Sequence, residues 1–292
     1  MNQSPQVSVI IPNYNYAEFL GQAIDSVLAQ TYRNFEIIVV NNGSTDNSLQ
    51  VLSKYKESIV LVDQSNQGQS GARNSGIIAS SGELIAFLDA DDFWEPTKLE
   101  KQLKLVSHEC QLIYCGIQHY ENETGKKSLR QFPHYKGNCQ ELFSRQPGVG
   151  IVIGGESTVI ITRDLLNIVG NFNIGLSVSS GWDFYRRCAN YTHFDYVPEL
   201  LTNYRIHNNN MSKDSLRNIE DIRKSFFVML DSLDKKSRLY GLMIGYFKLE
   251  INFVKTHLRN RYWGSAFCGV LNLPFHMSRI LVLRLRRCLT WN

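Results

Sequence analysis

The sequence predicts an α/β fold with a mostly parallel central sheet flanked by helices, followed by a helical extension at the C-terminal end. Three observations support this prediction. Short apolar runs rich in β-branched residues recur four times between residues 7 and 88, and each ends in polar residues or glycine. Helix-compatible sequence fills the gaps between them, which is typical of a parallel sheet covered on both faces. Helical sequence returns from about residue 215 to the end.

Each predicted element has its own signal. The four apolar runs predict buried strands at residues 7–12, 35–40, 59–62 and 84–88. The segment from 17 to 30 predicts a helix because its apolar residues recur on one stripe: Phe19, Leu20, Ala23, Ile24, Val27 and Leu28. Helix-compatible sequence also fills residues 45–55, 69–79 and 96–106. Farther along, we expect strands at 112–116 and 157–161, and a short helix at 164–169 that ends at Gly170.

The composition excludes several classes of protein. The chain has 292 residues, of which 43% are hydrophobic and 20% charged, so it can bury a core and is neither disordered nor fibrous. Its six cysteines form no Cys-x-x-Cys pair, which favours reduced thiols in the cytoplasm over a disulfide framework or a zinc site. The short polar N-terminus predicts no signal peptide, and no apolar stretch reaches the length of about 18 residues that a clean transmembrane helix needs.

The charge is divided unevenly along the chain. Residues 1–234 hold 20 Lys and Arg against 26 Asp and Glu, a net −6, whereas residues 235–292 hold 11 against 1, a net +10. Aromatic and aliphatic residues alternate with the basic ones in this tail, which predicts peripheral attachment to an anionic membrane surface. Two alternatives stay open. The tail helices pack on the rest of the chain, or residues 263–285 form a poor transmembrane segment, against which Pro274, His276 and Arg279 argue.

Polar segments follow all four of the first predicted strands. They are residues 12–15, 41–46, 63–68 and 89–92. The carboxyl ends of parallel strands meet at one edge of a sheet, and ligands of such folds bind there. We therefore expect the four segments to form one rim that holds the site.

Two of these segments suit a phosphate ligand. Asp89 and Asp91 repel each other unless a cation or hydrogen-bond donors neutralise them, and carboxylates of this kind hold Mg²⁺ or Mn²⁺ together with a diphosphate. The alternative is helix capping by Asp91 or Asp92. Residues 66–74 combine glycines with Arg73 at the start of a helix, which suits an anionic group, although an ordinary loop with a surface arginine is equally consistent.

Five motifs in succession resemble those of the family 2 glycosyltransferases of GT-A fold. They are residues 9–15 (VIIPNYN), 26–32 (SVLAQTY), 35–46 (FEIIVVNNGSTD), 66–76 (NQGQSGARNSG) and 87–92 (FLDADD). The resemblance covers about 100 residues, and later segments extend it to about residue 212. It implies a GT-A catalytic domain at residues 1–212, with a nucleotide-sugar-binding half at 1–106 and an acceptor-binding half at 107–212, and then a basic, aromatic-rich helical extension at 213–292.

The resemblance also implies a donor site. The loop from Pro12 resembles the one whose aromatic residue packs against the nucleotide base, here Tyr14, although a half-buried loop tyrosine is the plain alternative. Asp89 resembles the acid near the ribose, and Arg73 the basic residue near the nucleotide. Family members usually have Asp-Asp where this chain has two asparagines, and their second acid accepts from the uracil N–H. Asn42 can accept through its amide oxygen, but it is neutral and also a donor, so the base preference need not be the same.

The metal ligands follow from the same resemblance. Asp91 resembles the family's metal ligand, and Asp92 is expected to cap the following helix. His207, in the segment Tyr-Arg-Ile-His at 204–207, resembles the histidine near the metal and the diphosphate. We therefore expect Mn²⁺ or Mg²⁺ as cofactor.

The catalytic base is expected in the segment 181–187. Asp183 is the only carboxylate there and resembles the family base. The alignment leaves a second possibility, in which the family acids fall on Ser180 and Gly181 and are missing. In either alignment the plain alternative is that Asp183 pairs structurally with Arg186 or Arg187 one helical turn later.

These residues together predict an inverting, nucleotide-sugar-dependent glycosyltransferase. The acceptor would be a glycan or a lipid-linked sugar, in envelope polysaccharide synthesis by analogy with the family, and the enzyme would lie in the cytoplasm on the inner face of the cell membrane. We expect no nucleic-acid partner. The main alternative is a catalytically inactive protein that binds nucleotide sugars or glycans. A nucleotidyltransferase is disfavoured because residues 12–15 are not a glycine-rich, basic loop.

Overall fold

A computed structural model describes residues 6–145, 152, 155–177, 179–208, 210 and 220–226. The chain divides into two compact units, Met1–Phe143 with Val149–Met211, and Ser144–Gly148 with Ser212–Asn292. The sheet and the candidate site belong to the first unit. The basic tail lies outside the described residues, so its membrane attachment stays a prediction, as do the domain boundaries.

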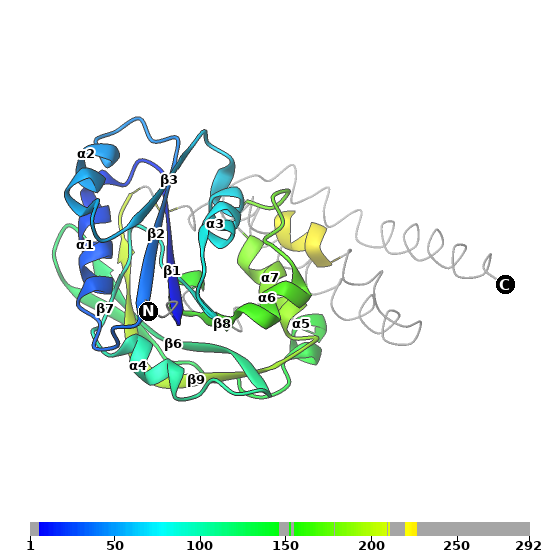
Figure 1. Ribbon diagram of the computed structural model, residues 1–292. Helices are drawn as coiled ribbons and strands as arrows, with labels where there is room; N and C mark the ends of the chain where they lie inside the picture. The colour runs from blue at the N-terminus through cyan, green and yellow to red at the C-terminus, as the bar shows by residue number, and fades with distance from the viewer. Residues whose placement is uncertain are drawn as a thin grey trace, which may run out of the picture. The chain divides into compact units, whose positions relative to one another are not determined.

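The first half of the sheet is parallel, as the sequence predicts. The strands β1 (Val7–Asn13), β2 (Phe35–Asn42), β3 (Val60–Gln64) and β4 (Leu84–Phe87) lie in the order β3-β2-β1-β4. Figure 1 labels the first three of these strands. Alternate residues of a strand point to opposite faces, so Val9 and Ile11 pack in the cluster that includes helix α1 (Ala17–Leu28), while Ile10 packs in the one that includes α3 (Gly68–Ala79). Burial on both faces explains why β1 reads as a continuous apolar run.

The second half of the sheet is mixed. Antiparallel β8 (Ile160–Thr162) joins β4 to β6 (Cys110–Glu121), and β6 pairs in parallel with the long strand β9 (His193–Ile206). The short strands β5 (Phe93–Trp94) and β7 (Lys127–Gln131) add to β9 and β6, both antiparallel. The first half of the sheet is therefore wholly parallel, and the second half combines the parallel pair of β6 and β9 with antiparallel pairs.

The remaining helices are short. They are α2 (Ser48–Leu52), α4 (Lys98–Leu103), α5 (Gln140–Arg145), α6 (Arg163–Val169), α7 (Ser180–Cys188) and the 3-10 turns η1 (Ser53–Tyr55) and η2 (Gly155–Thr158). As predicted, α6 ends at Gly170, which has a φ of 75° that favours glycine. The strand expected at 157–161 begins three residues late because η2 occupies its start. None of the described helices is long and apolar enough to cross a membrane.

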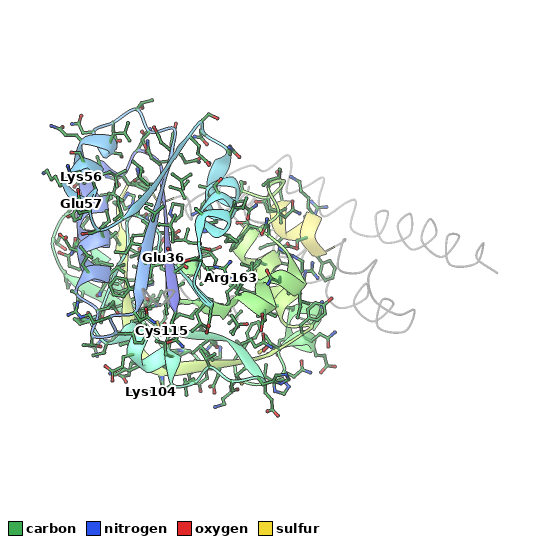
Figure 2. All side chains as sticks on the ribbon, viewed as in Figure 1. Glu36, Lys56, Glu57, Lys104, Cys115 and Arg163 are labelled. Carbon is green, nitrogen blue, oxygen red and sulfur yellow. The ribbon has the colours of Figure 1, made fainter. Side chains whose placement is uncertain are left out.

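Polar contacts at the amino end of β4 hold that strand in place. Glu36 Oε1 accepts from Ser8 Oγ at 2.6 Å and from Ser81 N at 2.7 Å, and Arg163 Nε donates to Gly82 O at 2.6 Å. Figure 2 labels Glu36 and Arg163 among the side chains that fill the unit. These bonds fix the position of the amino end of β4 in the sheet. They therefore also fix the position of the acidic segment at residues 89–92, which follows the carboxyl end of β4.

Candidate active site

The polar segments after β1, β2 and β3 meet at one edge of the sheet. Asn13 and Asn41 are register partners, and Asn13 Nδ2 donates to Asn41 Oδ1 at 3.4 Å and to Ser44 Oγ at 3.1 Å. Asn41 Nδ2 donates in turn to Asp63 Oδ1 at 2.8 Å. The rim expected from the sequence is therefore present at these strands.

Asn42 is buried, and both ends of its amide are used within the rim. Its Oδ1 accepts from Gln64 Nε2 at 2.8 Å and from Gln67 N at 3.0 Å, while its Nδ2 donates to Asn66 Oδ1 and to Gly68 O, each at 3.2 Å. A backbone N–H on one side and a carbonyl on the other fix the orientation of the amide. In this arrangement Asn42 holds the loop after β3.

The loop after β1 presents an aromatic ring to solvent. Pro12 is buried as part of the strand, whereas Tyr14 is 45% exposed. Asn15 has a φ of 57°, in the left-handed region, and its Oδ1 accepts from Thr45 N at 2.7 Å. This bond holds the turn that leaves the Tyr14 ring free to stack.

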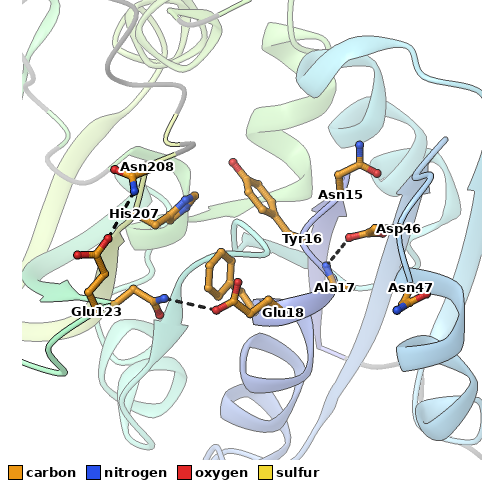
Figure 3. A pocket seen from close by; sticks show the side chains of 11 residues that line it. Asn15, Tyr16, Ala17, Glu18, Asp46, Asn47, Glu123, His207 and Asn208 are labelled. Atoms are coloured by element: carbon orange, nitrogen blue, oxygen red, sulfur yellow. Dashed lines mark hydrogen bonds between the residues drawn. The ribbon is translucent and has the colours of Figure 1, made fainter.

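A pocket of about 460 Å³ opens beside this loop. Figure 3 shows His207 and Asn208 on one side of it and Asn15, Asp46 and Asn47 on the other. Asp46 Oδ2 accepts from Ala17 N at 2.9 Å at the start of α1. The pocket therefore lies between the loop after β1 and the segment after β9.

The structure brings Asp91 and His207 together from positions far apart in the sequence. His207 Nε2 lies 3.0 Å from Asp91 Oδ2, and both side chains are largely buried. The ring of His207 packs edge-on against Tyr16, with centroids 5.5 Å apart, and lies tilted against Phe19, with centroids 4.8 Å apart. Burial, together with Asp91 and Asp89, raises the pKa of the Tyr16 hydroxyl. These contacts hold the imidazole next to the carboxylate.

This pair fits a metal ion that is shared with a ligand. A carboxylate and an imidazole suit Mn²⁺, and a diphosphate would supply further oxygens. No group of three or more potential ligands among His, Cys, Asp and Glu occurs in the part of the chain that the structure describes. Asp91 and His207 supply two donors, fewer than such an ion needs, so the remaining ligands would have to come from a bound nucleoside diphosphate and water.

Arg73 lies beneath the rim, paired with two acids. It is 1% exposed, and its Nη2 donates to Asp89 Oδ1 at 2.7 Å while its Nη1 lies 3.3 Å from Glu156 Oε1. Burial raises the pKa of Asp89 to about 6, against the effect of Arg73. The sequence predicted Arg73 and Asp89 near the nucleotide; the structure places Arg73 in contact with both Asp89 and Glu156.

Asp92 does not cap the following helix, contrary to our expectation. Its carboxylate accepts from Ser157 Oγ at 2.7 Å and from Arg205 N at 3.0 Å, and burial raises its pKa. Arg205 also donates through Nε to Asp91 O at 2.8 Å and packs over the Phe19 ring. Asp92 therefore links the segment after β4 to β9. Because His207 directly follows β9, this link positions its ring beside Asp91.

Asp183 is buried in α7 and is bound to two arginines. Arg186 Nη2 and Arg187 Nε each donate to its carboxylate at 3.0 Å. Its side chain is 5% exposed. These are the contacts of the structural alternative that the sequence left open.

Two site residues were not anticipated. Tyr16 follows the loop motif directly, and its position before the helix gave no sign that it would face His207. Glu156 is a lone acid after two glycines, in a segment without a recognisable motif. Its place beside Arg73 depends on the antiparallel pairing of β8, which no local pattern revealed.

Comparison with known sequences decides the family. The profile described as Glycosyl transferase family 2 matches residues 8–167. The chain belongs to glycosyltransferase family 2. This enzyme is 31% identical over 242 residues to an uncharacterized glycosyltransferase of Rickettsia typhi, covering 81% of this chain and 75% of that one. A glycosyltransferase of Nostoc is 53% identical over 100 residues, 33% of this chain and 31% of the relative.

Solved structures show the same GT-A fold. S. aureus TarS 1-349 in complex with UDP-GlcNAc has a TM-score of 0.65 at 19% identity, covering 85% of this chain and 72% of that one. The mannosyltransferase PcManGT from Pyrobaculum calidifontis, in complex with GDP-Man and Mn²⁺, has a TM-score of 0.63 at 16% identity, covering 99% of this chain and 82% of that one. The fold predicted from the five motifs is thereby confirmed.

Proposed function

We propose that this family 2 glycosyltransferase transfers a sugar, with inversion, from a nucleotide-diphosphate donor to a glycan or lipid-linked acceptor in envelope polysaccharide synthesis. The observation that supports this most is the pairing of Asp91 with His207 at 3.0 Å beside the acidic end of β4. Two neighbours of similar fold were solved with UDP-GlcNAc and with GDP-Man and Mn²⁺. The donor class of this chain is proposed from both.

Each part of the site has a proposed task. The exposed Tyr14 ring stacks on the nucleotide base, and Asp89, held by Arg73, binds the ribose. Asp91 and His207 would hold Mn²⁺ or Mg²⁺, and an ion bound there would supply positive charge against the charge that develops on the departing diphosphate. Because Arg73 is buried and paired with two acids, we assign it the role of orienting Asp89.

Nucleotide release separates this function from the inactive alternative. The purified chain is incubated with UDP, GDP and dTDP sugars and Mn²⁺, and free nucleoside diphosphate is measured with and without bacterial membrane extract as the source of acceptor. We expect release from at least one donor. Binding of a nucleotide sugar with no release under any of these conditions would support the inactive, binding-only protein.

We further propose that residues 235–292 attach the enzyme to the anionic inner face of the membrane, next to a lipid-linked acceptor. The net charge of +10 supports this, because each basic residue near an anionic surface contributes about 1 kcal/mol before screening. The full chain should float with vesicles in proportion to their anionic lipid content and be released by salt. No binding at low salt would contradict peripheral attachment, and retention after high salt and carbonate would indicate an inserted segment.

A further inference from the structure

The amino end of helix α7 carries no available carboxylate. Its first residues are Ser180, Gly181 and Trp182, and Asp183 is occupied by two arginine side chains. A glycosyl transfer to a hydroxyl nevertheless needs a group that takes the hydroxyl proton. The described part of the site therefore has to provide that group from another element.

Glu156 places its carboxylate at the position that α7 leaves empty. A Cβ atom built on Gly181 would collide with Glu156 Oε1 and would lie 2.9 Å from its Cδ. A side chain at position 181 would therefore occupy the same space as the carboxylate of Glu156. Glycine at 181 is the residue that leaves room for this acid.

The surroundings of Glu156 are consistent with a catalytic role of its carboxylate rather than a role in packing alone. Its side chain is largely buried, with 11% exposed, and one oxygen lies 3.3 Å from Arg73 Nη1. Arg73 binds Asp89, the proposed ribose ligand, through its other terminal nitrogen. The guanidinium group of Arg73 therefore bridges Asp89 and Glu156. Nearby, Ser180 Oγ and the Tyr185 hydroxyl are buried and make no hydrogen bond within the described residues.

Resting on the function proposed above, we infer that Glu156 is the general base of the transfer. The acceptor hydroxyl gives its proton to the Glu156 carboxylate as its oxygen bonds to the anomeric carbon. The bond from that carbon to the diphosphate breaks, and its electron pair leaves with the nucleoside diphosphate. Arg73, whose Nη1 lies 3.3 Å from Glu156 Oε1, orients the carboxylate. In this chain, Glu156 on η2 thus serves as the base, because the carboxylate of α7 is bound to two arginines.

Three variants test this assignment. Glu156→Gln keeps the shape of the side chain but cannot take a proton, so turnover should fall by roughly 10² to 10⁴. Glu156→Ala should be equally impaired, and adding Gly181→Asp should restore at least about tenfold of the loss, because a carboxylate again reaches the same space. Asp183→Asn is the matched control and should keep its turnover per folded molecule.

The readouts are nucleoside diphosphate release from UDP-GlcNAc and GDP-Man with Mn²⁺, calorimetric binding of UDP and GDP, and melting curves. We expect Glu156→Gln to lose release and to keep nucleotide binding. Undiminished release by Glu156→Gln would overturn the assignment, and so would a joint loss of release and nucleotide binding, since Glu156 would then only position Arg73. A folded double variant no better than Glu156→Ala would also overturn it. Wild-type protein that binds nucleotide and releases none would instead contradict the proposed function itself.

Discussion

Replacing Asp183 by asparagine should cost stability. The carboxylate accepts from Arg186 and Arg187 at 3.0 Å each, and the side chains of Asp183 and Arg186 are 5% and 6% exposed. Removing one partner of a buried ion pair costs about 3–5 kcal/mol, and the amide keeps one of the two bonds, so we expect about 3 kcal/mol. For a unit of this size each kcal/mol lowers Tm by about 2–4 °C, which predicts a decrease of about 6–12 °C.

The assay pairs a melting curve with nucleoside diphosphate release measured well below both melting temperatures. If Asp183 is structural, Tm falls and turnover per folded molecule stays the same. An unchanged Tm with turnover reduced by about 10² or more would refute this reasoning and would identify Asp183 as the base, as the sequence motif suggested.

Two further predictions concern buried polar groups. Burial lowers the pKa of Lys98 to about 8, so between pH 8 and its unfolded value near 10.5 only the unfolded chain holds this proton, and the contribution of Lys98 to stability rises with pH. Burial raises the pKa of the Cys139 thiol to about 11, and the contribution of that group falls with pH over the same range. Urea unfolding should show the free energy of unfolding of the wild type gaining about 3 kcal/mol on that of Lys98→Met over this pH range; a constant difference between the two proteins would contradict it. Asn42→Asp sets a carboxylate against Gly68 O and should cost about 1–3 kcal/mol without changing the ranking of UDP, GDP and dTDP sugars. A shift toward uridine donors would show instead that position 42 contacts the base.

The sequence predicts the elements that are determined locally. The strand β1 is buried on both faces, so its apolar run is unambiguous, and α1 shows a clear apolar stripe against it. The short connections between these elements then dictate a parallel arrangement. The polar residues at the carboxyl ends of β1, β2 and β3 consequently lie on one rim, as expected.

The elements that the sequence missed depend on pairing over long distances. The strand β9 mixes polar residues and Pro198 with apolar ones and is interrupted by register shifts against β6, so its residues show no clean alternation. The role of Asp92 depends on Arg205, 113 residues away. Whether Asp183 faces the site or its own arginines depends on the rotation of α7, and the place of Glu156 depends on where β8 pairs. None of these is encoded in a window of neighbouring residues.

The central claim is that Asp91 and His207 hold a divalent ion for the release of a nucleoside diphosphate. The most direct measurement is release from the donor that the wild type turns over, with Mn²⁺ and with EDTA, for the wild type and for Asp91→Asn. We predict release that requires Mn²⁺, is abolished by EDTA, and is lost in Asp91→Asn together with Mn²⁺-dependent donor binding. Full release by the wild type in EDTA, or by Asp91→Asn in Mn²⁺, would contradict the account.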